Sequence, residues 1–119
     1  MEARAVVTIY KICEQASWRA AESDGVFLGS IVDERDGFIH FSTSAQVAET
    51  AAKHFAGASD LMLVAVDAEA LGMSLVWEHA RGGDLFPHLY AALPLSAVRW
   101  SLPLLRGDDG RHVFPALDP

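Results

Sequence analysis

The feature that most constrains the fold of this sequence is a continuous apolar run at residues 61–66, near the middle of the chain. Six residues are far too few to cross a bilayer. No polar residue interrupts the run at alternate positions, which is typical of a β-strand covered on both faces. We therefore expect residues 61–66 to form the central strand of a sheet with packed residues on either side.

The remaining apolar segments are also short and are separated by turn-forming residues. Further strands are expected at residues 6–12, 26–28, 38–42, 74–79, 88–91 and 98–105. The connection at 30–37 holds three acids, one arginine and a glycine, and is expected to be an exposed loop. Residues 67–72 are expected to form a turn or a single helical turn.

Two helices are expected in the first half of the chain. One begins near Ser17 and ends at Gly25. The other has Thr43 as its N-cap, with Gln46 completing a capping box, and runs to about Phe55. Because a regular alternation of parallel strands and helices is absent, we expect an α+β fold of two small, mainly antiparallel sheets with two helices.

Composition sets the broad class of the protein. The 119 residues, 51% of them hydrophobic, predict one globular domain spanning 1–119, with a loose tail at 107–119. The net charge of −7, without a basic patch, disfavours nucleic acid as a partner. A single cysteine and the lack of a signal-peptide pattern favour the cytoplasm, and no membrane association is expected.

Polar residues alternate with large apolar residues in two of the expected strands. In residues 37–42, His40 and Ser42 share one strand face while Ile39 and Phe41 share the other. In residues 86–90, His88 and Tyr90 share a face opposite Leu89. Such strands place one face in the core and leave the other for solvent, a ligand or a partner.

A third strand contributes Trp77 and Glu78 on opposite faces, followed by Arg81. The residues expected to line a cleft are His40, Ser42, Trp77, Arg81, His88 and Tyr90.

Structural roles for the same residues stay open. Either histidine could be a hydrogen-bonded structural residue, and Trp77 could belong to the core. Glu78 could face solvent or pair with Arg81, and the two glycines after Arg81 suit either a hairpin or a phosphate-binding nest. Glycine fingerprints for nucleotides and nucleophile elbows are absent, and the histidine spacing with a lone cysteine predicts no metal site.

One group of motifs resembles a known family. The segments are residues 9–12 with Trp18, then 36–42, Trp77-Glu78, 81–83 and 86–90. In order and spacing they resemble the bacterial family called domain of unknown function 952, over roughly residues 7–100. That family in turn resembles the ADP-ribosyltransferase fold, a split pair of small antiparallel sheets whose cleft holds NAD in active relatives.

The resemblance implies roles for individual residues. His40 would bond the nicotinamide ribose, Tyr90 would support the nicotinamide, and Glu78 would orient the acceptor. His88 would replace one of these groups, as in the RNA 2'-phosphotransferase branch. Ser42, Thr43, Trp77 and Arg81 would be further ligand contacts. The order His, Glu, Tyr in this chain differs from the order His, Tyr, Glu in those enzymes.

Two hypotheses of function follow. The first is a transferase acting on NAD or an ADP-ribose-like nucleotide through His40, Glu78, His88 and Tyr90. The second is a catalytically inactive domain that binds a small ligand or a protein partner in the same cleft. A fold alone does not decide between them.

Overall fold

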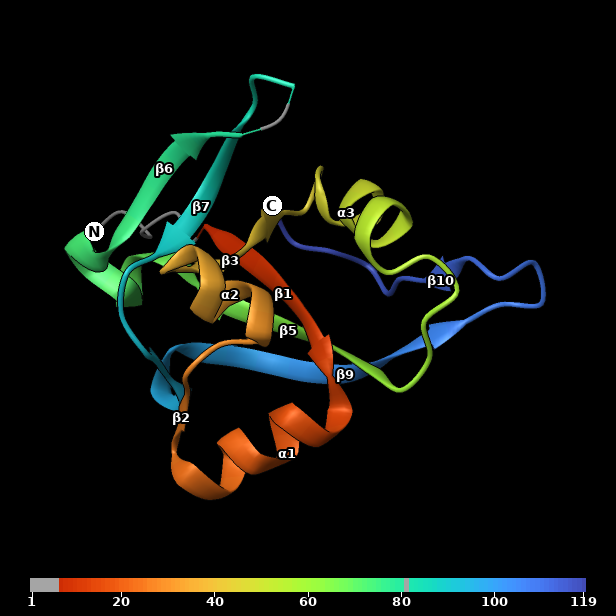
Figure 1. Ribbon diagram of the computed structural model, residues 1–119, viewed down its shortest axis with the longest axis horizontal. Coiled ribbons are helices and arrows are strands. Elements are labelled where there is room, and N and C mark those ends of the chain that lie inside the picture. The colour runs from red at the N-terminus through yellow and green to blue at the C-terminus, as the bar shows by residue number, and fades with distance from the viewer. Residues whose placement is uncertain (1–6, 81) are drawn as a thin grey trace, which may run out of the picture.

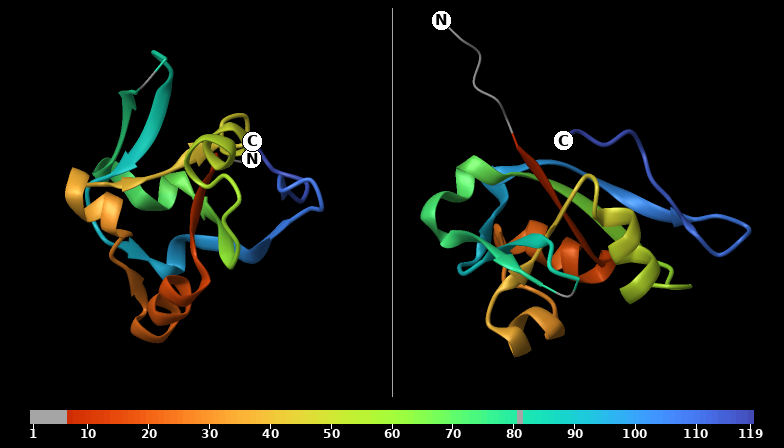
Figure 2. Two further views of the ribbon diagram at one scale, coloured as in Figure 1. Left: turned by 45° about the vertical axis from the view of Figure 1, so that its right-hand side comes forward. Right: turned by 90° about the horizontal axis from the view of Figure 1, so that it is seen from above.

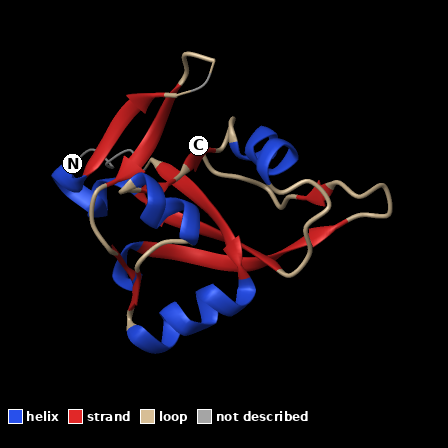
Figure 3. Ribbon diagram, viewed as in Figure 1, coloured by secondary structure: helices blue, strands red, loops and turns tan. Residues whose placement is uncertain are grey.

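The computed structural model describes residues 7–80 and 82–119. The described chain is an α+β fold of strongly curved antiparallel sheets with few helices (Figures 1 and 3). The helices are α1 (Gln15–Asp24), α2 (Ile31–Asp36) and α3 (Val47–His54), with 3₁₀ turns at Ala68–Ser74 and Leu95–Ala97. The strands are β1 (Thr8–Glu14), β2 (Val26–Phe27), β3 (Ile39–His40), β4 (Ser42–Thr43), β5 (Leu61–Asp67), β6 (Leu75–His79), β7 (Leu85–Leu89), β8 (Leu93–Pro94), β9 (Val98–Arg106) and β10 (His112–Val113).

The largest sheet has the strand order β10-β9-β5-β1-β4, and all its pairings are antiparallel. The apolar run forms β5 at its centre, which confirms the sequence prediction. Residues 62, 64 and 66 pack into a cluster on one face, whereas residues 61, 63 and 65 pack into a second cluster on the other. The absence of polar residues in this strand therefore follows from burial on both sides.

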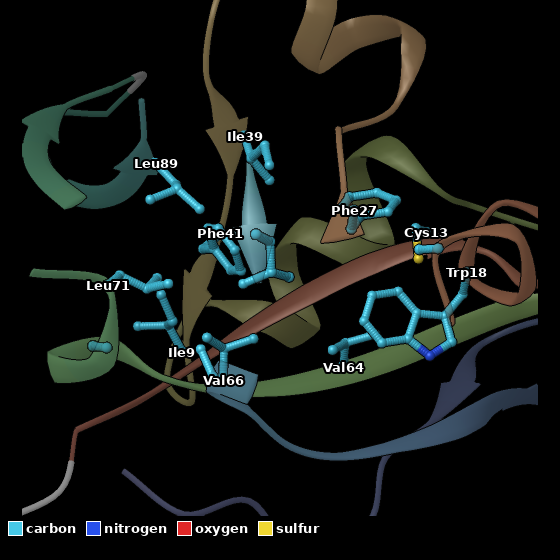
Figure 4. Packing of buried hydrophobic residues seen from close by; sticks show 14 of the residues in the cluster. Ile9, Cys13, Trp18, Phe27, Ile39, Phe41, Val64, Val66, Leu71 and Leu89 are labelled. Atoms are coloured by element: carbon cyan, nitrogen blue, oxygen red, sulfur yellow. The ribbon is translucent and has the colours of Figure 1, made fainter. Parts of the chain in front are cut away.

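The first cluster joins the large sheet to the rest of the fold. Trp18 of α1, Phe27 of β2 and Leu89 of β7 meet side chains of β1 and β5 there (Figure 4). Ile39 and Phe41, both expected in the core, are 3% and 2% exposed. The segment around β3 is thus held against the main body by its apolar face.

Two smaller sheets complete the fold. One pairs β2 with β8, and the other has the order β3-β7-β6. The β6–β7 hairpin projects from the body beside α2, as the views in Figures 1 and 2 show. The expected α+β class with antiparallel pairing is confirmed, but the described residues form three sheets where two were expected.

The expected exposed loop at 30–37 is instead helix α2. A capping box starts it: the Ser30 hydroxyl accepts from the Asp33 N–H at 3.3 Å, and the Asp33 carboxylate accepts from the Ser30 N–H at 2.8 Å. Gly29 precedes the helix, and a Cβ there would lie 2.8 Å from that of Asp33. Gly37 ends it in the left-handed conformation. The polar residues at 30–37 therefore belong to a capped helix, in which Asp33 is buried and Glu34 is exposed.

Several other boundaries differ from expectation; the strand expected at 88–91, for example, is β7 at Leu85–Leu89. Helix α3 begins at Val47, and only half of the expected capping box forms, with Gln46 Oε1 accepting from the Thr43 N–H at 3.0 Å. The strand expected at 38–42 divides at Phe41, because β3 pairs with β7 while β4 pairs with β1. The chain passes between two sheets at this point, so strand alternation does not continue from His40 to Ser42.

The C-terminal segment runs back along the body. The hydroxyl of Tyr10 donates to the carbonyl of Asp118 at 2.8 Å, and the N–H of Thr8 donates to the carbonyl of Pro119 at 3.2 Å. Phe114 and Leu117 pack against the second cluster. Among the described residues, no helix has the length and apolar character needed to cross a membrane.

Candidate functional site

The two expected histidines lie opposite each other in the three-stranded sheet β3-β7-β6. His40 of β3 pairs with His88 of β7, and their ring centroids are 5.6 Å apart. Phe38 stacks on His88 with 4.0 Å between ring centroids, and its ring also contacts those of His40 and Tyr90. The sheet register thus gathers four rings on one face of the hairpin.

His40 contacts a carboxylate through each ring nitrogen. Its Nδ1 lies 2.6 Å from Asp33 Oδ1, and its Nε2 lies 3.0 Å from Asp36 Oδ2. Carboxylates only accept hydrogen bonds, so both contacts are made together when the ring is the doubly protonated imidazolium. The side chain is still 35% exposed, and a ligand can reach it.

Asp33 is the anchor of this arrangement. It is 2% exposed, and its carboxylate accepts from the backbone N–H groups of Ser30 and His40 as well as from the His40 ring. Burial opposes ionisation of Asp33, but the hydrogen bond from His40 and the nearby Lys11 ammonium outweigh it and hold its pKa well below the usual range. Asp33 therefore carries its negative charge inside the protein.

Lys11 supplies the opposite charge from the core side. Its ammonium lies 3.0 and 2.8 Å from the two carboxylate oxygens of Asp33, and the residue is 5% exposed. Burial lowers the pKa of Lys11, and the Asp33 charge opposes this effect. Lys11 and Asp33 are therefore placed to compensate each other's charge inside the protein, and a chain of contacts runs from β1 through α2 to His40.

His88 has a carboxylate partner of its own. Its Nδ1 donates to Glu78 Oε1 at 2.8 Å, and the Tyr90 hydroxyl donates to the same oxygen at 2.6 Å. These two hydrogen bonds lower the pKa of Glu78, and the bond from Tyr90 has the larger effect. Glu78 is therefore ionised near neutral pH and orients two groups at once.

The two histidines consequently differ in what they can do. With its proton at Nδ1, the neutral His88 ring has Nε2 as an acceptor, and no described residue bonds that atom. His88 is 7% exposed, and the Phe38 ring stacks on it with 4.0 Å between ring centroids. Both nitrogens of the His40 ring thus face carboxylates, whereas only Nδ1 of the His88 ring does.

A shallow groove of about 280 Å³ adjoins the rings. Phe38 and Tyr90 form part of its wall, Ile39 and Leu89 are among its apolar lining residues, and Glu34 contributes a carboxylate. The groove is slightly smaller than the usual range for ligand pockets, roughly 300–1,000 Å³. It can hold one ring or sugar unit of a larger ligand.

The structure brings four of the expected site residues together and separates the rest. His40, Glu78, His88 and Tyr90 form one connected group. Ser42 is 4% exposed and bonds the Thr50 hydroxyl at 2.9 Å, away from this group. Trp77 lies opposite Pro87 on the other face of the hairpin. Thr43 contacts Gln46 at the start of α3, and Arg81 lies outside the described residues.

Sequence reasoning missed three residues that shape the site: Phe38, Asp33 and Lys11. Phe38 shares strand parity with His40, so alternation would have placed it on the same face. The Ser30-x-x-Asp33 spacing was a capping-box signal within the assumed loop. Lys11 was a charged residue in an otherwise apolar strand, where a buried partner should be sought.

Other potential chemistry is weaker. Cys13 is buried, and burial raises the pKa of its thiol to about 12, so it is a core residue and no nucleophile. Within residues 7–80 and 82–119, no group of three or more potential ligands is placed to hold a metal ion.

The hydrogen bond between Tyr90 and Glu78 gives a testable pH effect. This bond, together with partial burial, raises the pKa of Tyr90, and burial raises that of Tyr10, the other tyrosine in the chain. Glu78→Gln should therefore lower the midpoint of one of two tyrosine transitions in an ultraviolet absorbance titration. Tyr90→Phe should remove the same transition. An unchanged titration in Glu78→Gln would contradict the assigned bond.

Together the fold and site define a class: a small α+β domain with curved antiparallel sheets and a histidine pair oriented by carboxylates. The chain belongs to the family described as protein of unknown function DUF952, whose model matches residues 12–101. This match confirms the family resemblance seen in the motifs. No protein in the curated set matches the chain.

The chain is similar to solved structures of CC0527, a protein of Caulobacter crescentus. Its X-ray structure is 50% identical, with a TM-score of 0.86 over 89% of this chain and 93% of that one. Its solution NMR structure is 51% identical, with a TM-score of 0.79 over 87% and 90% of the two chains. The architecture described above is thus similar to one found by two experimental methods.

Proposed function

We propose that this domain binds NAD or an ADP-ribose-like nucleotide at the face formed by His40, Glu78, His88 and Tyr90. The observation that carries the proposal is the convergence of two histidines, each oriented at Nδ1 by a carboxylate. Such paired orientation is characteristic of sites that place polar groups for a ligand. The resemblance to the ADP-ribosyltransferase fold supplies the ligand class.

The residues suggest how a nucleotide would bind. His40 donates from Nε2 to a ribose hydroxyl, and the groove beside Phe38 and Tyr90 receives one ring of the ligand. The groove is too small for a whole dinucleotide, so the remainder would lie on the surface. Binding of modest affinity is therefore expected.

On bound NAD the proposed chemistry is cleavage of the N-glycosidic bond. The bond between ribose C1' and the nicotinamide nitrogen breaks, and nicotinamide leaves with the bonding electron pair. Nearby carboxylate charge, including that of Glu78, stabilises the oxocarbenium-like transition state. An acceptor hydroxyl, water in the simplest case, attacks C1', and His88 Nε2 takes its proton.

A binding domain without catalysis is the second candidate, and one observation favours it. Glu78 is already bonded to His88 and Tyr90, and both nitrogens of His40 are bonded to carboxylates. Groups that satisfy one another in this way can hold a surface rigid for recognition. Release of nicotinamide from NAD separates the two candidates: release supports the transferase, and binding without release supports the binding domain.

Thermal melts test the binding proposal. A nucleotide at about one hundred times its dissociation constant should stabilise the wild type by roughly 2.7 kcal/mol, a rise of several degrees in melting temperature. NAD, ADP-ribose and a nucleoside 2'-phosphate are the probes. His40→Ala should abolish the rise because it removes the proposed ribose contact.

The matched control is His54→Ala, which removes an exposed histidine of α3 that takes no part in the proposed site. This variant should keep the full rise in melting temperature. If none of the three probes stabilises the wild type, nucleotide binding is wrong.

A further inference from the structure

We propose that Asp36 is a specificity-determining residue, which admits a ligand with free ribose hydroxyls at His40 and excludes one with a phosphate there. The proposal rests on the proposed function and deepens it. Its basis is the contact of 3.0 Å between Asp36 Oδ2 and His40 Nε2.

Nε2 is the ring atom of His40 that a ligand can use. Nδ1 is committed to Asp33, which is 2% exposed and sealed from solvent. Asp36 is 32% exposed and lies at the last turn of α2. A ligand that approaches His40 from solvent therefore meets the Asp36 carboxylate at the same atom.

The charges around Asp36 favour a hydroxyl over a phosphate at His40 Nε2. The Lys11 ammonium lies against Asp33, and the His40 ring lies between Asp33 and Asp36. Glu78 adds a further negative charge beside His88. A phosphate at Nε2 would thus meet like charge with no uncommitted described cation beside it, whereas a hydroxyl can accept from His40 and donate to Asp36.

Arg35 favours the ionised form of the Asp36 carboxylate. Its Nε lies 3.0 Å from the other oxygen of Asp36, and its side chain is 70% exposed to water. The hydrogen bond from Arg35 lowers the pKa of Asp36, so the carboxylate is charged near neutral pH. In the wild type the Nε of Arg35 is already engaged by Asp36.

The test compares two ligands that differ only in a phosphate on a distal ribose hydroxyl of the kind that His40 would bond: ADP-ribose and ADP-ribose 2''-phosphate. Isothermal titration calorimetry of the wild type should show tighter binding of ADP-ribose by at least about tenfold, equivalent to about 1.4 kcal/mol. Asp36→Asn should bring the two affinities within about threefold, because the phosphorylated ligand gains affinity. The variant should fold, since a carboxylate at a helix C-terminus opposes the helix dipole.

Glu22→Gln is the matched control, because it removes one carboxylate from an exposed position on α1 and changes net charge equally. It should keep the wild-type preference. Equal binding of both ligands by the wild type, or a preference that survives in Asp36→Asn, would overturn the role of Asp36 while nucleotide binding stands. If the wild type binds neither ligand, the proposed function fails and the role of Asp36 with it.

Discussion

Asp33→Asn is expected to lower the free energy of unfolding by about 3–5 kcal/mol. The substitution leaves the Lys11 ammonium buried without its counter-charge, and breaking one side of a buried ion pair is far costlier than losing an exposed one. Lys11→Met should be destabilising for the same reason. Urea denaturation followed by circular dichroism measures both variants.

The double variant Lys11→Met/Asp33→Asn serves as the control for this pair. The double variant holds neither charge, so no buried charge is left unpaired. It should therefore lose less stability than the sum of the losses in the two single variants. Additive effects, or single-variant losses below about 1 kcal/mol, would contradict a coupled buried pair.

The same aspartate predicts a dependence of stability on pH. The folded state holds the pKa of Asp33 below its unfolded value, so below about pH 4 the unfolded chain binds the extra proton more readily. The stabilisation is present above that pH and is lost as pH falls further. Acid denaturation of the wild type should show this loss, and Asp33→Asn should show a shallower slope.

Phe41→Ala is expected to cost about 3–5 kcal/mol, whether or not a nucleotide is present. Phe41 is 2% exposed, and its ring fills the core where the chain passes from β3 to β4. Leu28→Ala, at a position that is 69% exposed, should change stability by less than about 0.5 kcal/mol. Melts of both variants give the comparison, and a cost below about 1 kcal/mol for Phe41→Ala would contradict its burial.

The main sheet could be predicted from the sequence because burial on both faces dictates the residues of its central strand. A strand buried on both faces needs apolar residues at every position, and β5 meets that requirement. The core positions of Ile39, Phe41 and Leu89 followed from alternation within short strands. The spacing of His40 and His88 in the sequence could not give their pairing, which depends on the register between β3 and β7.

The partners of the histidines were harder to predict. Asp33 lies in a polar segment whose composition resembles a loop, and its burial depends on Lys11 from a distant strand. Ser42 was assigned to the face of His40 by alternation, but the chain changes sheets at Phe41. Local patterns describe one strand at a time, and tertiary pairing decides which faces meet.

His40 and His88 are proposed to form one nucleotide site. NMR spectra of protein labelled with ¹⁵N at its five histidines test it directly, because each imidazole gives its own signals. Addition of NAD or ADP-ribose should shift the signals of His40 and His88 and leave those of His54 and His112 in place. Saturating nucleotide that leaves His40 and His88 unchanged, or that shifts all five histidines alike, would contradict the claim.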